Sequence, residues 1–152
     1  MIGPVFEDSP WIAEGTWSKR PFKSLDLLHG ALCKTVQSSP EDKQINLIRA
    51  HPDLAGRAAQ TGTLTAASAS EQASAGLNKL SDEEIALLQK YNQSYREKFD
   101  FPFVVCARQN KKEAILKGFE SRLKQSRQKE IKTALAEIEK IAYLRLQDII
   151  ES

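Results

Sequence analysis

The fold class of this 152-residue chain follows from one stretch, Ser81-Asp82-Glu83-Glu84-Ile85-Ala86-Leu87-Leu88. A Ser followed three residues later by a Glu is typical of a capping box, in which each side chain bonds to the backbone N–H of the other residue. Apolar side chains then recur at helical spacing, at Ile85, Leu88, Tyr91 and Tyr95. The stretch therefore predicts a long amphipathic helix.

Helix-start signals of a similar kind recur along the rest of the chain. They are Asp8-Ser9-Pro10, Ser24, Ser39-Pro40-Glu41-Asp42 and Asn110-x-x-Glu113. The first helix is predicted to include Trp17 and to end at Pro21. The last is predicted to run from about Gln128 to Ile150. Most of the chain is thus expected to be helical.

One segment breaks this pattern, Phe101-Pro102-Phe103-Val104-Val105-Cys106. Its aromatic and β-branched residues favour an extended conformation, but no second such segment offers a partner strand. The stretch from Thr61 to Ala67 is predicted to be a loop that packs over a ligand. We therefore expect an all-α fold, a single compact domain over residues 1–152 with about seven to eight helices and one short extended segment.

The composition is that of an ordinary soluble globular protein, with 41% hydrophobic and 28% charged residues. No apolar run approaches the ~18 residues that a membrane span needs, and no secretory signal is visible, so no membrane association is expected. Cys33 and Cys106 lie far apart and are interpreted as free thiols of a reducing compartment, which predicts a cytoplasmic protein. Two histidines and two cysteines without ligand spacing predict no metal site, and no nucleotide-binding motif is present.

The basic residues are concentrated in one part of the chain. Nine basic and three acidic residues lie between Arg108 and Lys132, in a chain of net charge +2. A basic segment can bind nucleic acid. Here Glu113, Glu120 and Glu130 are interspersed among the basic residues, which is typical of a solvated helix face. We therefore expect no nucleic-acid partner.

His51 stands where a helix must end. The residues from Ile45 to Ala50 have helical character, and Pro52 disfavours the α conformation at the residue before it. The negative end of the helix dipole favours the protonated imidazole, whereas burial favours the neutral ring. A ring under both effects can titrate near neutral pH, as a proton-transfer residue requires. A histidine that merely closes the helix is the alternative.

Glu71 also has two interpretations. Ser68-x-x-Glu71 fits a capping box, so the carboxylate could simply cap a helix. The same carboxylate could instead belong to a site. On spacing alone, the capping role is the favoured interpretation.

Arg145 lies in an unusual place for a charged residue. The last predicted helix carries one apolar stripe, made by Ile131, Leu135, Ile138, Ala142 and Ile149. Arg145 falls inside that stripe, so its guanidinium must either reach out to solvent or pair with an anion. If the buried charge were poorly paired, Arg145→Leu would leave stability unchanged or raise it.

Five separated motifs occur in order along nearly the whole chain. They are Ser9-Pro10-Trp11-Ile12-Ala13-Glu14, His51-Pro52-Asp53-Leu54-Ala55, Ser68-x-x-Glu71-Gln72-x-x-Ala75-Gly76-Leu77, Asn92-x-x-Tyr95-x-x-Lys98-Phe99-Asp100-Phe101-Pro102-Phe103-Val104-Val105, and Leu144-Arg145-Leu146 with Asp148. In this combination the chain resembles the OHCU decarboxylase family (2-oxo-4-hydroxy-4-carboxy-5-ureidoimidazoline decarboxylase) of urate catabolism.

The resemblance implies an all-helical fold, typically a homodimer, without a metal or organic cofactor. It implies His51 as the catalytic acid/base with Glu71 beside it, and Arg145 as the residue that holds an anion or a carbonyl. The substrate-binding residues that it implies are Pro52, Ser68, Gln72, Phe103, Val104, Val105, Cys106 and Ala107. The chain departs from the family pattern at Asp100 and near Gln109-Asn110, where the family usually has glycine.

The activity that the resemblance implies is decarboxylation of OHCU to (S)-allantoin. This substrate carries a hydroxyl and a carboxylate on one ring carbon, beside a ring C=N that can accept the electrons left when CO2 departs. The protein must then hold the ring, favour loss of the carboxylate and deliver a proton to one face. The alternative is a non-catalytic helical module of the same fold that binds a ureide or a partner protein.

Overall fold

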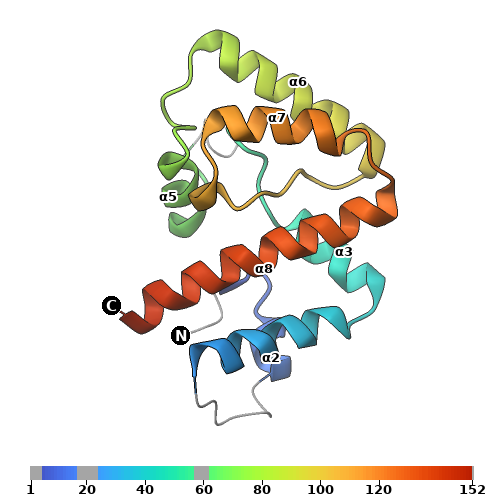
Figure 1. The fold of residues 1–152 in the computed structure, drawn as a ribbon, viewed down its shortest axis with the longest axis vertical. Helices are drawn as coiled ribbons and strands as arrows, with labels where there is room; N and C mark the ends of the chain where they lie inside the picture. The colour runs from blue at the N-terminus through green and yellow to red at the C-terminus, as the bar shows by residue number, and fades with distance from the viewer. Residues whose placement is uncertain (1–4, 17–23, 57–61, 152) are drawn as a thin grey trace.

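The helical segments stand where local sequence signals favour them. The computed structural model describes residues 5–16, 24–56 and 62–151, and in these ranges the chain forms seven α-helices, one short 3-10 helix and no strand (Figure 1). The elements are α1 (Trp11–Thr16), α2 (Leu25–Gln37), α3 (Glu41–Arg49), α5 (Ala66–Ser74), α6 (Asp82–Phe99), η3 (Ala107–Gln109), α7 (Lys112–Arg122) and α8 (Arg127–Glu151). The expected all-α class is confirmed. The predictions for Trp17, Pro21 and Thr61 lie outside the described residues.

The clearest predicted helix start is confirmed in detail. The Ser81 hydroxyl accepts from the Glu84 N–H, and the Glu84 carboxylate accepts from the Ser81 N–H, which completes the capping box of α6. Ser24 caps α2 in the same way, by accepting from the Leu27 N–H. Local spacing was sufficient at both places because a cap involves only residues within one helical turn.

Two other predicted starts differ from the structure. Pro40 occupies the N-cap of α3, and the Ser39 hydroxyl donates backward to the Val36 carbonyl. The side chain of Asn110 likewise donates backward, to the Cys106 carbonyl, and α7 begins at Lys112 without a side-chain cap. In both cases the polar side chain satisfies a carbonyl of the preceding element instead of an N–H of the next helix.

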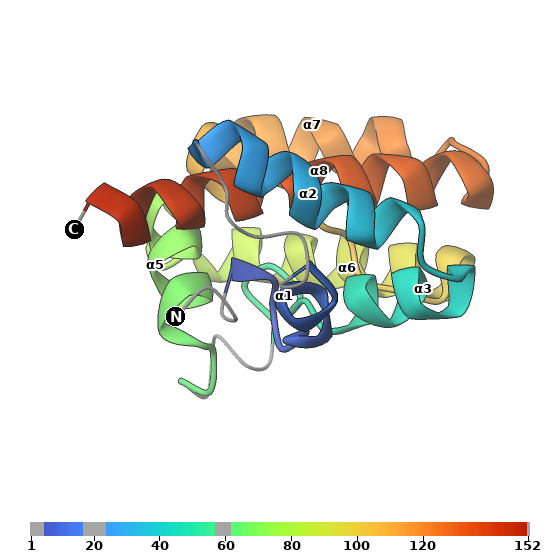
Figure 2. The same ribbon diagram turned by 90° about the horizontal axis from the view of Figure 1, so that it is seen from below.

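The longest helix, α8, organises the molecule. It crosses the middle of the fold and contacts α2, α3 and α6 (Figure 1). Seen from below, α2, α7 and α8 form one layer, and α1, α3, α5 and α6 form the other (Figure 2). The predicted apolar stripe of α8 faces the protein interior, since Ile131, Ile138 and Ala142 are buried. No helix of the described residues is long and apolar enough to cross a membrane.

The predicted extended segment, residues 101–106, is extended and has no partner strand among the described residues. It is held instead by side chains. Arg122 donates from Nη1 to the Val104 carbonyl at 2.6 Å and from Nε to Glu130 at 2.8 Å, and Tyr95 donates to the same Glu130 oxygen at 2.5 Å. This buried network thereby satisfies the Val104 carbonyl, which a neighbouring strand would otherwise bond.

Asp100, a departure from the family pattern, closes α6 in a left-handed conformation with φ 64°. A glycine adopts this conformation without strain, and Asp tolerates it better than most residues. Arg49 supports it through an ion pair of 2.7 Å with the Asp100 carboxylate. Asn110, the other departure, has φ −137°, which any residue adopts. The backbone conformations at Asp100 and Asn110, on either side of the extended segment, are therefore adopted without glycine.

Candidate active site

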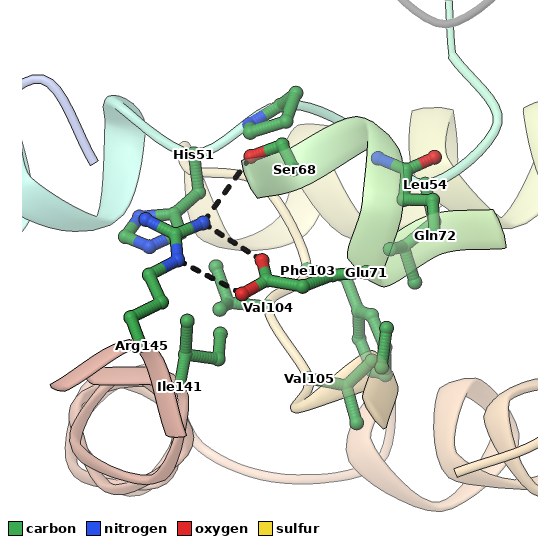
Figure 3. A pocket seen from close by; sticks show the side chains of 12 residues that line it. His51, Leu54, Ser68, Glu71, Gln72, Phe103, Val104, Val105, Ile141 and Arg145 are labelled. Atoms are coloured by element: carbon green, nitrogen blue, oxygen red, sulfur yellow. Dashed lines mark hydrogen bonds and ion pairs between the residues drawn. The ribbon is translucent and has the colours of Figure 1, made fainter. Parts of the chain in front are cut away.

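One pocket brings together residues from four separate parts of the chain. It lies among the end of α3, helix α5, the extended segment and α8 (Figure 3). Its lining consists of His51, Pro52, Leu54, Ser68, Glu71, Gln72, Phe103, Val104, Val105, Ala107, Ile141 and Arg145. Of the residues named from sequence, all except Cys106 line this pocket, and Leu54 and Ile141 are additional members.

Cys106 does not line the pocket, and its backbone groups bond to side chains of the protein. Its backbone N–H donates to the Glu137 carboxylate at 3.1 Å, and its carbonyl accepts from Asn110. Burial raises the pKa of its thiol. Cys106 is thus not among the residues that line this pocket.

His51 lines the pocket, and one of its ring nitrogen atoms has no hydrogen-bond partner among the described residues. Its ring is 6% exposed, and Nδ1 lies 3.0 Å from the Leu47 carbonyl. A carbonyl can only accept, so Nδ1 carries the hydrogen and Nε2 carries the lone pair. Within the described residues Nε2 has no hydrogen-bond partner. His51 is thus arranged as a neutral base.

The pKa of His51 differs from the value near neutral pH that the sequence led us to expect. Burial lowers the pKa of His51 to about 4, although the Leu47 carbonyl and the negative charge of Glu7 raise it. The positive charge of Arg145 lowers it further. The prediction of titration near neutral pH is wrong because the cost of burying the charged ring exceeds the effect of the helix end.

Glu71 lines the pocket and does not cap a helix, so the capping interpretation that its spacing favours is wrong. Thr65 is the N-cap of α5, and its hydroxyl accepts from the Ser68 N–H at 3.2 Å. Glu71 therefore lies in the second turn of α5, where no capping box can form. The predicted loop is also shorter than expected, because α5 begins at Ala66. The carboxylate of Glu71 is free to reach α8.

Arg145 binds the carboxylate of Glu71. Its Nε donates to Glu71 Oε2 at 2.9 Å, and its Nη2 donates to Glu71 Oε1 at 2.7 Å. The side chain is 6% exposed, so it does not reach solvent. Burial alone would lower the pKa of Arg145, but the carboxylates of Glu71 and Glu7 outweigh it and raise that pKa. The interpretation of Arg145 as a buried cation that pairs with an anion is confirmed.

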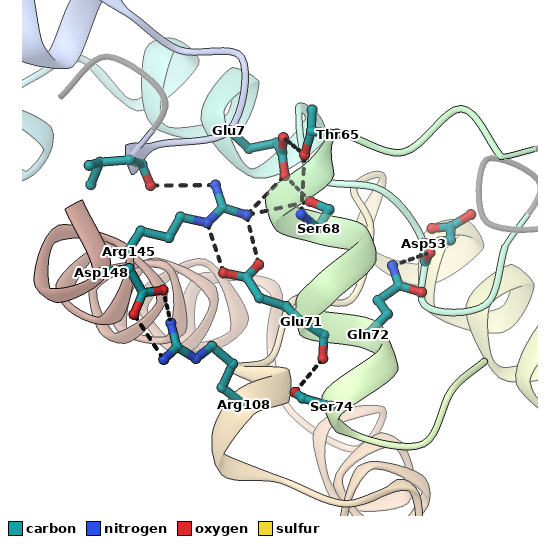
Figure 4. A network of polar contacts seen from close by, with 11 residues as sticks. Glu7, Asp53, Thr65, Ser68, Glu71, Gln72, Ser74, Arg108, Arg145 and Asp148 are labelled. Carbon is teal, nitrogen blue, oxygen red and sulfur yellow. Dashed lines mark hydrogen bonds and ion pairs between the residues drawn. The ribbon is translucent and has the colours of Figure 1, made fainter. Parts of the chain in front are cut away.

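Glu7 is the residue that the sequence reading missed. Its side chain is 3% exposed, and it accepts from Thr65 at 2.8 Å, from the Ser68 hydroxyl and from Arg145 Nη2 at 3.2 Å (Figure 4). Burial would raise the pKa of Glu7, but the hydrogen bond from Ser68 and the charge of Arg145 lower it below 4.5. Nothing in the spacing of Glu7-Asp8-Ser9-Pro10 distinguishes it from a surface acid.

Gln72 supports the turn that follows His51. Its Oε1 accepts from the Ala55 N–H at 2.9 Å, where the backbone is left-handed with φ 50°. From α6, Asn92 donates to the Leu54 carbonyl at 2.9 Å, and Arg96 pairs with Asp53 at 2.9 Å. The turn is therefore fixed from two helices, and the rim of the pocket with it.

The pocket as it stands is narrow. Its cavity volume is about 30 Å³, which is room for water but small for a ligand with a five-membered ring. The side chains of Glu71 and Arg145, joined to each other, are both part of its lining (Figure 3). Among the described residues no group of three His, Cys, Asp or Glu side chains could hold a metal ion. The pocket lining offers a neutral base in His51, a guanidinium in Arg145 and a carboxylate in Glu71.

The sequence matches the family described as OHCU decarboxylase over residues 1–147. Curated relatives with the name 2-oxo-4-hydroxy-4-carboxy-5-ureidoimidazoline decarboxylase include those of Halalkalicoccus jeotgali and Mus musculus. The first is 43% identical over 148 residues, which cover 97% of this chain and 82% of the relative. The second is 41% identical over 150 residues, which cover 99% of this chain and 84% of the relative.

Two crystal structures share the fold. One, of OHCU decarboxylase in the presence of (S)-allantoin, has a TM-score of 0.80 at 20% identity, with 97% of this chain and 96% of that chain covered. The other, of (S)-allantoin synthase, has a TM-score of 0.76 at 25% identity, with 97% of this chain and 47% of that chain covered. By its sequence match over nearly the whole length, this chain belongs to the OHCU decarboxylase family.

Proposed function

We propose that this protein decarboxylates OHCU to (S)-allantoin in urate degradation, in the pocket of His51, Glu71 and Arg145, without a cofactor. Family membership supports the reaction. The observation that carries the site is the unpaired Nε2 of His51, a buried base in the same pocket as a guanidinium and a carboxylate. Perturbed titratable groups that meet in a pocket are typical of catalytic sites.

In the proposed reaction the substrate supplies its own electron sink. The bond to CO2 breaks, its electrons form a double bond to the neighbouring ring carbon, and the π electrons of the C=N move to nitrogen. That nitrogen takes a proton, which comes from water in the overall balance. The result is an enol, which becomes allantoin when the hydroxyl loses its proton and the neighbouring carbon gains one.

His51 suits both proton transfers of that last step. Its neutral Nε2 accepts the hydroxyl proton, and the imidazolium that forms delivers a proton to the neighbouring carbon. A single base on one side of a held ring delivers to one face, which would give one enantiomer. The depressed pKa of His51 favours rapid return of the proton to carbon.

Arg145 and Glu71 would hold the substrate. A guanidinium binds a carboxylate or a ring carbonyl through its two parallel N–H groups, and a carboxylate accepts from the N–H groups of a ureide. Both side chains are bound to each other in this structure. Substrate entry therefore requires that they exchange some of these hydrogen bonds for bonds to the ligand.

The extended segment would form one wall for the ring. Phe103, Val104 and Val105 line the pocket, and Pro52 and Ala107 complete its apolar part. The network of Arg122 and Glu130 fixes this backbone. A wall held from behind limits how far a bound ring can tilt, which favours protonation of one face.

The test of this function is optical. The unstable substrate is generated in situ from urate, and optically active allantoin is followed with and without the protein. We expect faster formation of the (S) enantiomer and no effect of EDTA on the rate. Racemic allantoin formed at the uncatalysed rate, together with binding of allantoin, would instead support the non-catalytic binding module.

Two finer proposals concern assembly and location. We propose a homodimer, on the resemblance to the family, and a cytoplasmic protein, because Cys33 and Cys106 are both free and buried. Light scattering on the purified protein tests the first. Localisation of a tagged chain in cells tests the second.

We also propose that the basic segment does not bind nucleic acid. Several of its charges have partners within the fold, since Arg108 pairs with Asp148, and Arg122 pairs with the buried Glu130. Phosphate binding needs basic side chains that are accessible together. Retention on heparin that falls steeply with added salt would contradict this proposal.

A further inference from the structure

Arg145 is held by two carboxylates that differ in position. Glu71 lines the pocket, whereas Glu7 does not. Both bond to Nη2 of Arg145, at 2.7 Å from Glu71 and at 3.2 Å from Glu7. Figure 4 shows Glu7 approaching the guanidinium from the N-terminal segment and Glu71 approaching it from α5. A ligand in the pocket can therefore compete with Glu71 for Arg145 while Glu7 stays in place.

The carboxylate of Glu7 is fixed by more than the arginine. One of its oxygens accepts from the Thr65 hydroxyl, and the other accepts from the Ser68 hydroxyl. Its own carbonyl accepts from the Ser9 hydroxyl at 2.8 Å. A buried carboxylate with every oxygen bonded is a rigid support, whereas the side chain of Glu71 has Arg145 as its hydrogen-bond partner in the described residues.

The charges of the site make a second argument. With His51 neutral, Arg145 carries one positive charge, and Glu7 and Glu71 carry one negative charge each. When His51 takes a proton, it becomes a cation in the field of Arg145, which disfavours it. Glu7 is the carboxylate whose charge acts in the opposite direction on His51. The other charged groups that face His51 are Arg145 from α8 and Glu71 from α5.

We propose that Glu7 is a positioning residue for the reaction: it holds Arg145 in place while Glu71 turns to the substrate, and its charge offsets that of Arg145 when His51 is protonated. This inference rests on the proposed function. It gives the two acids different tasks, because only Glu71 would contact substrate. Glu7 would act through Arg145, Ser68 and His51.

The experiment compares Glu7→Gln and Glu7→Asp with Glu130→Gln. Glu130 is a matched control for the titration of His51, since its carboxylate is also buried and also bound to an arginine, but it does not line the pocket. We expect Glu7→Gln to lower kcat by about 100-fold, the cost of a misplaced catalytic group, with a much smaller change in KM. Glu7→Asp should recover part of the rate, since it keeps the charge but shortens the reach.

The direct readout is the titration of His51 by NMR. The chain has only two histidines, so a His29→Gln variant identifies the signals of His51. Loss of the Glu7 charge should lower the pKa of His51 below its wild-type value, and Glu7→Asp should restore it toward that value. Glu130→Gln should leave the pKa of His51 unchanged. Unfolding curves of all variants show how much of each effect is loss of stability.

Two results would overturn the inference. One is a wild-type kcat and an unchanged His51 titration in Glu7→Gln. The other is a loss of rate in Glu7→Gln that is proportional to its loss of stability and comes without a shift in the pKa of His51. Failure of the proposed function is a separate outcome, since the wild-type protein would then not accelerate allantoin formation at all.

Discussion

Arg145 and Glu71 lie 74 positions apart in the chain and are joined by two hydrogen bonds, of 2.9 Å from Nε and 2.7 Å from Nη2. This parallel pairing fixes the guanidinium plane as well as its position. It connects α5 to α8 at the pocket, which both side chains line (Figure 3). The same two side chains therefore stabilise the unliganded site and are proposed to bind the ligand.

Replacement of His51 by alanine should abolish turnover in a protein that still folds. General acid–base catalysis contributes about 10²–10⁴-fold, so the rate should fall by at least about 100-fold. Loss of the buried ring and of its bond to Leu47 should cost about 1–3 kcal/mol. Circular dichroism and the allantoin assay measure both. His29→Ala is the control, since His29 bonds to the Glu139 carbonyl away from the pocket and should keep its rate.

Stability should fall as the pH falls from about 6.5 toward 4, because of His51. Its pKa is about 4 when folded against 6.5 for an unperturbed imidazole, so between these values the unfolded chain binds more protons. The expected loss between pH 7 and pH 5 is about 2 kcal/mol. Glu7, whose pKa is lowered, adds its own loss only below 4.5. Urea unfolding at pH 7 and pH 5 measures this difference in unfolding free energy. If a His51→Ala variant kept the full difference, His51 would not be its source.

Glu71→Gln should lose most activity while α5 stays capped. The N-cap of that helix is Thr65, so the substitution removes only the charge that pairs with Arg145. We expect a fall in rate of about 100-fold, as for other residues that hold a reacting group. The matched control is Glu84→Gln, which changes the capping box of α6, away from the pocket. Full activity in Glu71→Gln would remove this residue from the proposed mechanism.

Arg145→Leu should destabilise the protein, contrary to the expectation from sequence. The charge is well paired, so its removal strands two buried carboxylates, at a cost of about 3–5 kcal/mol. Arg145→Lys should recover stability in part and little activity, because an ammonium cannot form the parallel pair. Addition of Glu7→Gln and Glu71→Gln to Arg145→Leu should restore stability and leave the protein inactive. Thermal melts and initial rates measure these variants, and a fully stable Arg145→Leu would contradict the pairing.

Part of the site followed from the sequence because its signals are local. The end of α3 before His51 depends on Pro52, and the inward position of Arg145 depends on apolar residues within two turns of α8. The roles themselves came from the resemblance to a family. The pocket is lined by ten of the eleven residues named at that stage, and Cys106 is the one that is not among its lining residues.

The sequence by itself determined where α2 and α6 begin, which face of α8 is apolar, and that a charged residue lies on that face. These properties depend on neighbours within about one or two turns, so spacing encodes them. Only the tertiary structure decided which anions meet Arg145, that Glu71 is no cap, and that His51 is neutral. Each of these depends on residues from distant parts of the chain: Glu7 and Arg145 are 138 positions apart, and the pKa of His51 follows from burial. The energy of an ion pair depends on the distance between its charges in space, and the cost of burying an imidazole depends on the groups packed around it. The order of residues along the chain specifies neither of these directly.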